Sequence, residues 1–176
     1  PILSVFINGS YGNKVYNYLS MKLTHMNSPW TNQLNAVNGR AQLVPINPNK
    51  VYEDGTMWYN DVSNVMVANP GASIPRATIN DPNDNDRISD RYIEDGSYIR
   101  LKNISLGYTF PKKTIDKLGL SNLRIYANIQ NLLTITGYDG YDPEIGASTS
   151  SVNVYGWDNG RYPSPTVYSF GLNVSF

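Results

Sequence analysis

Apolar and polar residues alternate along several stretches of the chain with the period of a β-strand. From Ile104 to Phe110 an apolar residue stands at every second position, and small or polar residues fill the positions between. Longer or weaker versions of the same pattern occur elsewhere. Together they predict four strands, over residues 2–12, 94–110, 121–136 and 164–176.

The segments between the predicted strands differ in length. Residues 13–93 and 137–163 are long and rich in Gly, Pro, Asn and Asp, whereas residues 111–120 form a short link. Apolar residues at helical spacing predict a short amphipathic helix over Lys14–Met26. In the short link we expect a single helical turn that Gly119 ends.

In an antiparallel meander, alternate connections lie at the same end of the sheet. Both long loops therefore lie at one end, with the short link and both chain termini at the other. Bacterial outer-membrane barrels show this asymmetry, with short periplasmic turns and long extracellular loops. We therefore expect extracellular loops over 13–93 and 137–163 and a periplasmic turn over 111–120.

Alternating strands build soluble β-sandwiches as well as membrane barrels. Strands of ten or more residues exceed the usual length in soluble sheets, and the polar strand faces would need partners in a dry core. Four strands cannot close a barrel. The pattern therefore predicts an all-β chain that forms part of a larger transmembrane antiparallel barrel, with a soluble carbohydrate-binding sandwich as the alternative.

The phase of the alternation assigns side chains to lipid or to the barrel lumen. Those expected to face lipid are Ile104, Leu106, Tyr108, Ile125, Ile129, Phe170, Leu172 and Val174. Those expected to face the lumen are Ser105, Asn128, Gln130 and Asn173.

The strand predicted over residues 94–110 changes phase in its middle. Its apolar residues before Asn103 are Ile99 and Leu101, at odd positions, whereas those after it stand at even positions. A uniform strand cannot turn both sets outward. We expect either a β-bulge near Lys102 and Asn103, or a place for Ile99 and Leu101 above the bilayer, where phase no longer matters.

Composition narrows the function classes. The formal net charge is zero, with 14 basic and 14 acidic residues, so nucleic acid is not an expected partner. Cysteine is absent, which excludes disulfides and thiolate metal sites. The 14 tyrosines fit membrane interfaces and ligand-contacting loops. Because the sequence begins at Pro1 with a half-formed strand, we interpret it as a piece of a longer protein.

Residues 80–90 are the most polar part of the first long loop and include Asp81, Asp84 and Asp86. Carboxylates at this density can bind calcium. The segment lacks the central glycine and terminal glutamate of an EF-hand loop, so a solvated polar loop is the favoured interpretation. No other metal or cofactor is expected.

Enzymatic chemistry has little support in the sequence. Asp139, Asp142 and Glu144 could act as acid and base in glycoside cleavage, but the sequence gives no separation between them, and a structural role is favoured. His25 is the only histidine and is expected on the surface of the predicted helix. No catalytic triad can be assembled, and we predict that the chain is not an enzyme.

Five aromatic residues of the second long loop are candidates for contact with a substrate or a partner: Tyr138, Tyr141, Tyr155, Trp157 and Tyr162. A loop packed on itself is the equal alternative. Ordering such loops costs about 1–2 kcal/mol of backbone entropy per residue. We therefore expect both long loops to pack partly against other protein, with Tyr141, Trp157 and Tyr162 as anchors.

Four blocks of the sequence resemble, in the same order, the C-terminal end of SusC/RagA-type TonB-dependent outer-membrane transporters of Bacteroidetes. They are GSYGNKVYN (Gly9–Asn17), RISDRYIEDGSYIRLKNISLGYTFP (Arg87–Pro111), LRIYANIQNLLTITGYDGYDPEIG (Leu123–Gly146) and GWDNGRYPSPTVYSFGLNVSF (Gly156–Phe176). The segment Ser28–Asn85 resembles nothing that we can place.

The resemblance implies the last four strands of a plugged barrel of about 22 strands. It also implies import of an oligosaccharide or peptide across the outer membrane, a SusD-like lipoprotein lid on the extracellular loops, and TonB acting on a plug that this chain lacks. The residues that resemble the family's barrel-assembly signal are Tyr168, Phe170, Leu172, Val174 and Phe176.

Overall fold

The computed structural model describes residues 1–26, 29–145 and 155–176. Two parts of the predicted long loops, residues 27–28 and 146–154, lie outside the described residues. Within the described ranges, no helix has the length and apolar character needed to cross a membrane.

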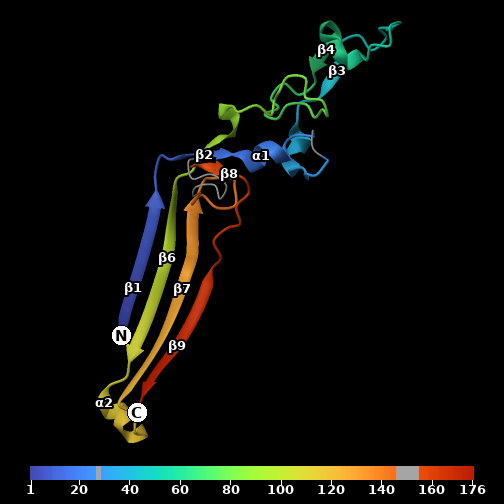
Figure 1. Cartoon of the computed structure of the whole chain (residues 1–176). Helices are drawn as coiled ribbons and strands as arrows, with labels where there is room; N and C mark the ends of the chain where they lie inside the picture. Colours follow the sequence, from blue (N-terminus) through green and yellow to red (C-terminus); the bar gives the residue numbers. More distant parts are fainter. Residues whose placement is uncertain (27–28, 146–154) are drawn as a thin grey trace. The chain divides into compact units, whose positions relative to one another are not determined.

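The chain divides into two compact units, and their segments can be traced in Figure 1, where the colours follow the sequence. Unit 1 combines Pro1–Asn17 with Ile93–Phe176, and unit 2 comprises Tyr18–Tyr92. Most of the predicted loop 13–93 is therefore a unit with its own short helices and strands, which its irregular sequence pattern does not reveal.

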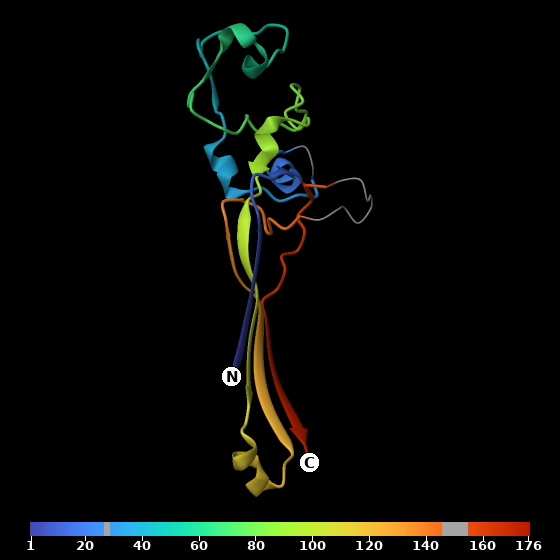
Figure 2. The same ribbon diagram turned by 90° about the vertical axis from the view of Figure 1, so that its left-hand side faces the viewer.

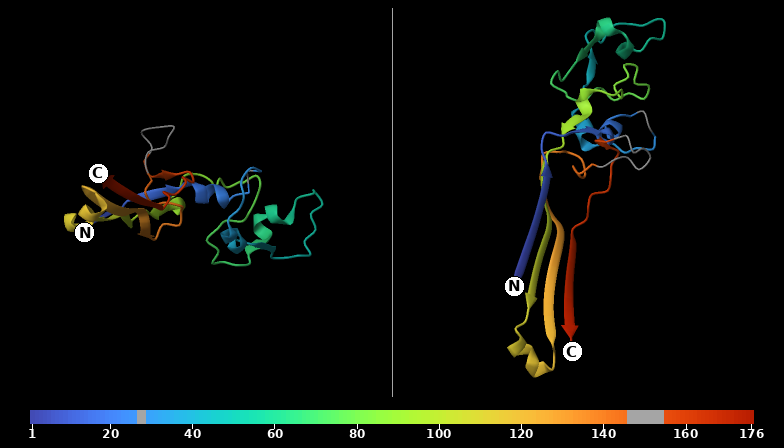
Figure 3. Two further views of the ribbon diagram at one scale, coloured as in Figure 1. Left: turned by 90° about the horizontal axis from the view of Figure 1, so that it is seen from below. Right: turned by 60° about the vertical axis from the view of Figure 1, so that its left-hand side comes forward.

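Unit 1 is built on a four-stranded antiparallel sheet in the order β1-β6-β7-β9. Figures 1 and 3 show the four strands side by side, and Figure 2 shows that they form one layer. This confirms the predicted meander, although β6 and β9 begin a few residues later than predicted. The strands are β1 Ile2–Ser10, β6 Tyr98–Thr109, β7 Asn122–Thr136 and β9 Val167–Ser175.

A line of bulges crosses this sheet at one level. Between β1 and β6, Phe6 pairs with Asn103 and Ile7 pairs with Leu101, which leaves Lys102 as an extra residue on β6. A bulge of this kind lets the strand change phase without turning its side chains to the wrong face. Of the two alternatives that the sequence left open, the bulge near Lys102 and Asn103 is therefore confirmed.

The next strand carries the matching bulge. Two residues of β7, Asn131 and Leu132, lie opposite the single residue Lys102. Asn131 has a φ of 51°, in the left-handed region that asparagine tolerates better than most residues. Because of the two bulges, the pairing register returns Ile99 to the face that holds Ile104.

The register gathers apolar side chains on one face of the sheet, which we call the apolar face. Leu3, Leu106, Ala127 and Phe170 form one row across the four strands. Leu106 is 51% exposed and Phe170 is 80% exposed, so no second layer of the described chain covers them. The register places on this face all eight residues predicted to contact lipid, Ile104, Leu106, Tyr108, Ile125, Ile129, Phe170, Leu172 and Val174.

The opposite, polar face of the sheet is shaped by glycines beneath large side chains. A Cβ atom added to Gly107 would collide with the guanidinium of Arg124, and one added to Gly171 would overlap the ring of Tyr126. Glycine at these two positions therefore lets long side chains lie flat across neighbouring strands.

The short link between β6 and β7 has the predicted form. It contains α2 (Lys112–Ile115) and η5 (Asp116–Leu118), and Gly119 follows with a φ of 71°. Ile115 is only 2% exposed, so this link holds a small apolar core of its own. The helical turn ended by Gly119 is confirmed.

A second, small sheet of unit 1 has the order β5-β2-β8. It contains β2 (Lys14–Asn17), β5 (Ile93–Asp95) and β8 (Trp157–Asp158). The helix predicted over Lys14–Met26 is therefore wrong in its first part. Val15 is 1% exposed, and β2 pairs with β5 on one side and with β8 on the other; these pairings override the helical spacing of its apolar residues.

Unit 2 consists of short elements joined by long turns. Its β3 and β4 pair in antiparallel fashion. The elements are α1 Tyr18–Leu23, η1 Asn35–Gly39, β3 Leu43–Pro45, η2 Trp58–Asn60, η3 Val62–Asn64, β4 Val65–Val67 and η4 Asp90–Tyr92.

Polar contacts hold much of unit 2 together. Asn64, 4% exposed, donates to the carbonyl of Asn47 over 3.1 Å and to the hydroxyl of Tyr52 over 3.0 Å. His25 is buried and shares a 2.9 Å hydrogen bond with the hydroxyl of Tyr92. The expectation that His25 lies on a helix surface is therefore wrong, because it follows α1 and packs against η4.

Candidate functional site

The candidate site is the connection between β7 and β9, which we call the return loop. Its described residues are 137–145 and 155–166. In Figures 1 and 3 the return loop, which contains β8, lies beside β2, at the end of the main sheet opposite α2. It contains the five aromatic residues predicted to contact a substrate or a partner.

A buried arginine ties the return loop to the main sheet. Arg100 of β6 is 3% exposed and forms ion pairs with Asp142 and, over 2.7 Å, with Glu144. Its Nε donates to Thr134 Oγ1 of β7 over 2.8 Å. The pairing register places Arg100 beside Asn8 and Thr134, so Arg100 belongs to the polar face of the sheet. The return loop covers the polar face at this position.

Asp142 receives donors from several sides. Its carboxylate accepts the backbone N–H groups of Ser164 over 3.0 Å and of Glu144 over 2.9 Å, besides the guanidinium of Arg100. Burial alone would raise the pKa of Asp142, but the Ser164 N–H and the Arg100 guanidinium outweigh it and hold the pKa below its ordinary value. The carboxylate therefore stays charged and acts as a structural anchor.

A second, more exposed pair lies next to this anchor. Lys102 donates to both carboxylate oxygens of Glu144, over 2.9 Å and 2.7 Å. Both side chains remain about one-third exposed, 33% for Lys102 and 35% for Glu144. The bulged residue Lys102 thus reaches the same loop segment as Arg100, and we call Arg100, Lys102, Asp142 and Glu144 the loop anchor.

A tyrosine and an aspartate organise the rest of the return loop. The hydroxyl of Tyr138 donates to Asp158 over 2.6 Å, and both residues are buried. Asp158 also accepts the backbone N–H groups of Gly160 over 2.9 Å and Arg161 over 3.2 Å. Burial and the neighbouring Asp158 carboxylate raise the pKa of Tyr138 well above its ordinary value, so the phenol remains a hydrogen-bond donor.

Trp157 of the return loop packs on the small sheet. Trp157 stacks on Tyr16 of β2 with ring centroids 4.7 Å apart, and the Tyr16 N–H donates to the Gly156 carbonyl over 2.7 Å. The backbone at Gly156 has a φ of 72°, a conformation that favours glycine. Tyr138 thus packs within the loop, as the self-packed alternative expects, whereas Trp157 packs on β2.

Three of the five predicted aromatic residues project from the loop. Tyr141 is 62% exposed, Tyr155 is 76% exposed and Tyr162 is 85% exposed. Exposed tyrosines offer an apolar ring with a polar tip, which suits contact with sugars, peptides or another protein. Contact of these three residues with a ligand or partner stays a prediction.

The acidic residues considered for other chemistry are placed differently. Asp142 and Glu144 are bound to Arg100 and Lys102, so the structure gives them an anchoring role rather than the geometry of an acid and base pair. Arg100 was not singled out from the sequence. An arginine in the polar phase of a predicted strand, with acids in the following loop, is the signal that could have found it.

The weak calcium candidate does not form a ligand cluster. In unit 2, Asp81 accepts the side-chain amide of Asn85 over 2.7 Å and the N–H of Asp86 over 3.2 Å. Over residues 1–26, 29–145 and 155–176, no group of three or more His, Asp or Glu side chains is arranged to hold a metal ion. Asp81, Asp84 and Asp86 therefore do not converge in this structure.

The residues assigned to the lumen and to barrel assembly remain predictions of role. Register places Asn128, Gln130 and Asn173 on the polar face, opposite the apolar face. The predicted assembly residues lie on the apolar face of β9, except the last, which follows the strand: Tyr168, Phe170, Leu172, Val174 and Phe176. Phe170 and Phe176 are among the most exposed large side chains, at 80% and 94%.

Comparison with known proteins relates nearly the whole chain to large receptors. The chain is 32% identical over 179 residues to TonB-dependent receptor P3 of Formosa agariphila, a match that covers 99% of this chain and 15% of that protein. It is 36% identical over 93 residues to TonB-dependent receptor SusC of Bacteroides thetaiotaomicron, covering 52% of this chain and 8% of SusC. No family model matches.

Solved structures agree with the sequence relatives. The structure of the RagAB peptide transporter superposes with a TM-score of 0.66 at 19% identity, covering 99% of this chain and 16% of that chain. The same importer in its open-open state gives a TM-score of 0.60 at 18% identity. At these identities the likeness shows the fold. The chain spans about 15% of the length of the first curated relative that it matches.

Proposed function

We propose that this chain, a member of the SusC/RagA-type TonB-dependent receptors, is part of a protein that imports a large nutrient, an oligosaccharide or a peptide, across the bacterial outer membrane. In this proposal the four-stranded sheet supplies the last four strands of a plugged barrel of about 22 strands. Energy comes from TonB acting on the plug, which lies outside this chain. The chain itself acts without a cofactor and is not an enzyme.

The observation that carries this proposal is the uncovered apolar face of the main sheet. Leu172 is 62% exposed and Phe170 is 80% exposed, and their neighbours across β6 and β7 are also apolar. In the wall of a transmembrane barrel, an apolar face of this kind lies against lipid. A soluble sandwich would cover this face with a second sheet about 10 Å away, and the described chain supplies none.

The polar face supports the same arrangement. Its residues include Asn128, Gln130 and Asn173, which would need many partners in a dry core but can meet water in a lumen. Near the return loop the same face carries the buried Arg100. We infer that the loop anchor holds the return loop over the extracellular end of the lumen, where it helps to form the entrance.

We further propose that a SusD-like lipoprotein covers the extracellular loops. Tyr141, Tyr155 and Tyr162 are the exposed aromatic residues of the return loop, and exposed aromatics often dominate protein contacts. Trp157 is a weaker anchor candidate than the sequence suggests, because its ring is already stacked on Tyr16.

Transport is tested with the full-length receptor in its host. The uptake of fluorescent oligosaccharides and peptides is compared between wild-type cells, cells lacking the receptor, and wild-type cells treated with an uncoupler of the proton-motive force. We expect uptake of at least one nutrient class to require both the receptor and the proton-motive force. Equal uptake in all three conditions for every nutrient would contradict the proposed function.

The lid is tested separately by co-purification in mild detergent. Tyr162→Ala removes an exposed ring, whereas Tyr162→Phe keeps the ring and serves as the matched control. We expect the alanine variant to retain less of the SusD-like protein than the phenylalanine variant, and the triple alanine variant of Tyr141, Tyr155 and Tyr162 to retain least. Full retention by the triple variant would show that these tyrosines do not anchor the lid.

A further inference from the structure

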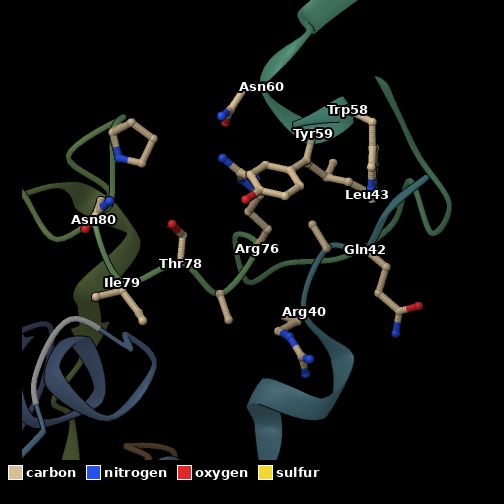
Figure 4. A pocket seen from close by; sticks show the side chains of 13 residues that line it. Arg40, Gln42, Leu43, Trp58, Tyr59, Asn60, Arg76, Thr78, Ile79 and Asn80 are labelled. Atoms are coloured by element: carbon tan, nitrogen blue, oxygen red, sulfur yellow. The ribbon is translucent and has the colours of Figure 1, made fainter. Parts of the chain in front are cut away.

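Unit 2 contains an open pocket of about 640 Å³, within the range of sites that bind small ligands. Three separate segments form it, residues 40–43, residues 58–60, and residues 76–80 together with Pro82. Figure 4 shows the pocket from close by, with Arg76 and Tyr59 near its middle and Asn60 and Thr78 facing the same open space.

The charge of the pocket is one-sided. Its only ionised side chains are Arg40 and Arg76, and no Asp or Glu belongs to the lining. Arg40 donates to the carbonyl of Val37 over 3.1 Å, so it is partly engaged within unit 2. In the described part of the chain, Arg76 has no hydrogen bond or ion pair. An unpaired guanidinium in a concave site favours a carboxylate or sulfate, which it can bind through two parallel hydrogen bonds.

The other lining groups favour a hydroxylated ring over a bare anion. Trp58 and Tyr59 pack edge to face at 5.7 Å, and Tyr59 is 41% exposed, so an aromatic surface lies beside the arginine. Asn60 and Thr78 can each donate and accept hydrogen bonds, as sugar hydroxyl groups do. The pocket therefore combines the guanidinium of Arg76, an aromatic surface and groups that can form hydrogen bonds with hydroxyls.

We propose that this pocket binds an acidic sugar unit of an oligosaccharide, with its carboxylate or sulfate on Arg76 and its ring beside Trp58 and Tyr59. The inference deepens the proposed function, because it names acidic saccharides as a class of nutrient that the receptor captures. It does not depend on the lid, since every group that it uses belongs to unit 2.

Binding is measured by calorimetry with the full-length receptor in detergent, using tetragalacturonate as the probe. Its methyl ester has the same rings without the charges and serves as the ligand control. We expect tetragalacturonate to bind and its methyl ester to bind at least about tenfold more weakly. Arg76→Gln should weaken tetragalacturonate binding by about tenfold to a hundredfold, the range for one hydrogen-bonded charge.

Two further variants separate charge recognition from misfolding. Arg76→Lys keeps the charge without the planar fork and should fall between wild type and Arg76→Gln. Arg91→Gln removes an exposed guanidinium elsewhere in unit 2 and should bind as wild type does. The barrel's heat-induced shift on gels checks that each variant is folded.

Several results would overturn the inference. Equal binding by wild type and Arg76→Gln, or no binding of tetragalacturonate to wild type, would remove the site. Tighter binding of tetraglutamate than of tetragalacturonate would make it a peptide site instead, and inorganic sulfate that binds as tightly would make it a simple anion site. Energy-dependent uptake that is unaffected by Arg76→Gln would leave the proposed function intact while the inference fails.

Discussion

Removal of the Arg100 side chain by Arg100→Met should release the return loop from the main sheet. The substitution deletes the ion pairs with Asp142 and Glu144 and the 2.8 Å bond to Thr134, while the methionine keeps most of the apolar stem. Asp142 is only 4% exposed and would then be left as a buried carboxylate without a cation. Removing one partner of a buried ion pair typically lowers stability by about 3–5 kcal/mol.

The expected cost lies at the lower end of that range. Asp142 keeps the backbone N–H groups of Ser164 and Glu144 as donors after the substitution. A cost of about 3 kcal/mol corresponds to a rise in the opening equilibrium of the loop on the order of a hundredfold. The structure therefore predicts a local change, because the strands of the sheet keep their own ladder of backbone hydrogen bonds.

Hydrogen exchange followed by mass spectrometry reports this opening directly in the full-length receptor. Peptides covering residues 138–145 should exchange on the order of a hundredfold faster in Arg100→Met. The matched control is Lys102→Met, which breaks the pair with Glu144, whose two side chains are each about one-third exposed, and should change exchange by well under tenfold, as exposed pairs contribute about 0–1 kcal/mol. Equal effects of the two variants, or no effect of Arg100→Met, would refute the assignment of Arg100 as the main anchor.

The same anchor gives the loop a defined dependence on pH. The folded-state pKa of Asp142 is depressed, so its contribution to stability is present above the ordinary carboxyl pKa of about 3.9 and is lost as the pH falls below that value. Wild-type exchange, corrected for its intrinsic pH dependence, should therefore stay slow near neutral pH and rise in acid. An Arg100→Met loop should show a much smaller change over the same range.

Three further substitutions test other parts of the structure. Leu172→Arg should destabilise the barrel by about 2–4 kcal/mol if this position lies near the bilayer midplane, whereas Asn173→Arg on the polar face should cost far less, as measured by denaturant unfolding in lipid vesicles. Gly171→Val should lower the yield of folded barrel, because its Cβ would overlap the Tyr126 ring, and Tyr126→Ala in the same chain should restore part of that yield. Tyr138→Phe should speed exchange around Asp158 by up to about a hundredfold, since a buried acceptor loses its donor at a cost of about 1–3 kcal/mol, and unchanged exchange would show that the bond does not stabilise the loop.

The strands and their faces could be predicted from the sequence because one physical rule governs them. A strand in a barrel wall turns alternate residues to lipid, so the period of apolar residues gives both its existence and its orientation. The phase break before Ile104 predicted the bulge at Lys102 for the same reason. Over Lys14–Asn17 the helical spacing of apolar residues predicted a helix wrongly, because this short strand pairs with a strand on each side.

The site could be predicted only in outline. Composition identified the return loop and its aromatic residues, but burial separates Tyr138 and Trp157 from the exposed Tyr162, and burial depends on partners that are distant in sequence. Arg100 and Asp142 are 42 residues apart, so no local pattern joins them. The fold of unit 2 rests on polar contacts and turns, such as those of Asn64, which leave no periodic signal.

If the main sheet is part of a barrel wall, its apolar face contacts lipid and its polar face contacts water. The chain has no cysteine, so a single spin label can be introduced at Leu172 or at its neighbour Asn173, with any cysteine elsewhere in the full-length receptor replaced. In lipid vesicles, we expect a label at Leu172 to be accessible to oxygen and shielded from a water-soluble nickel complex, and a label at Asn173 to show the reverse. The same accessibility at both positions, or a label at Leu172 that only the nickel complex reaches, would contradict this assignment of the two faces.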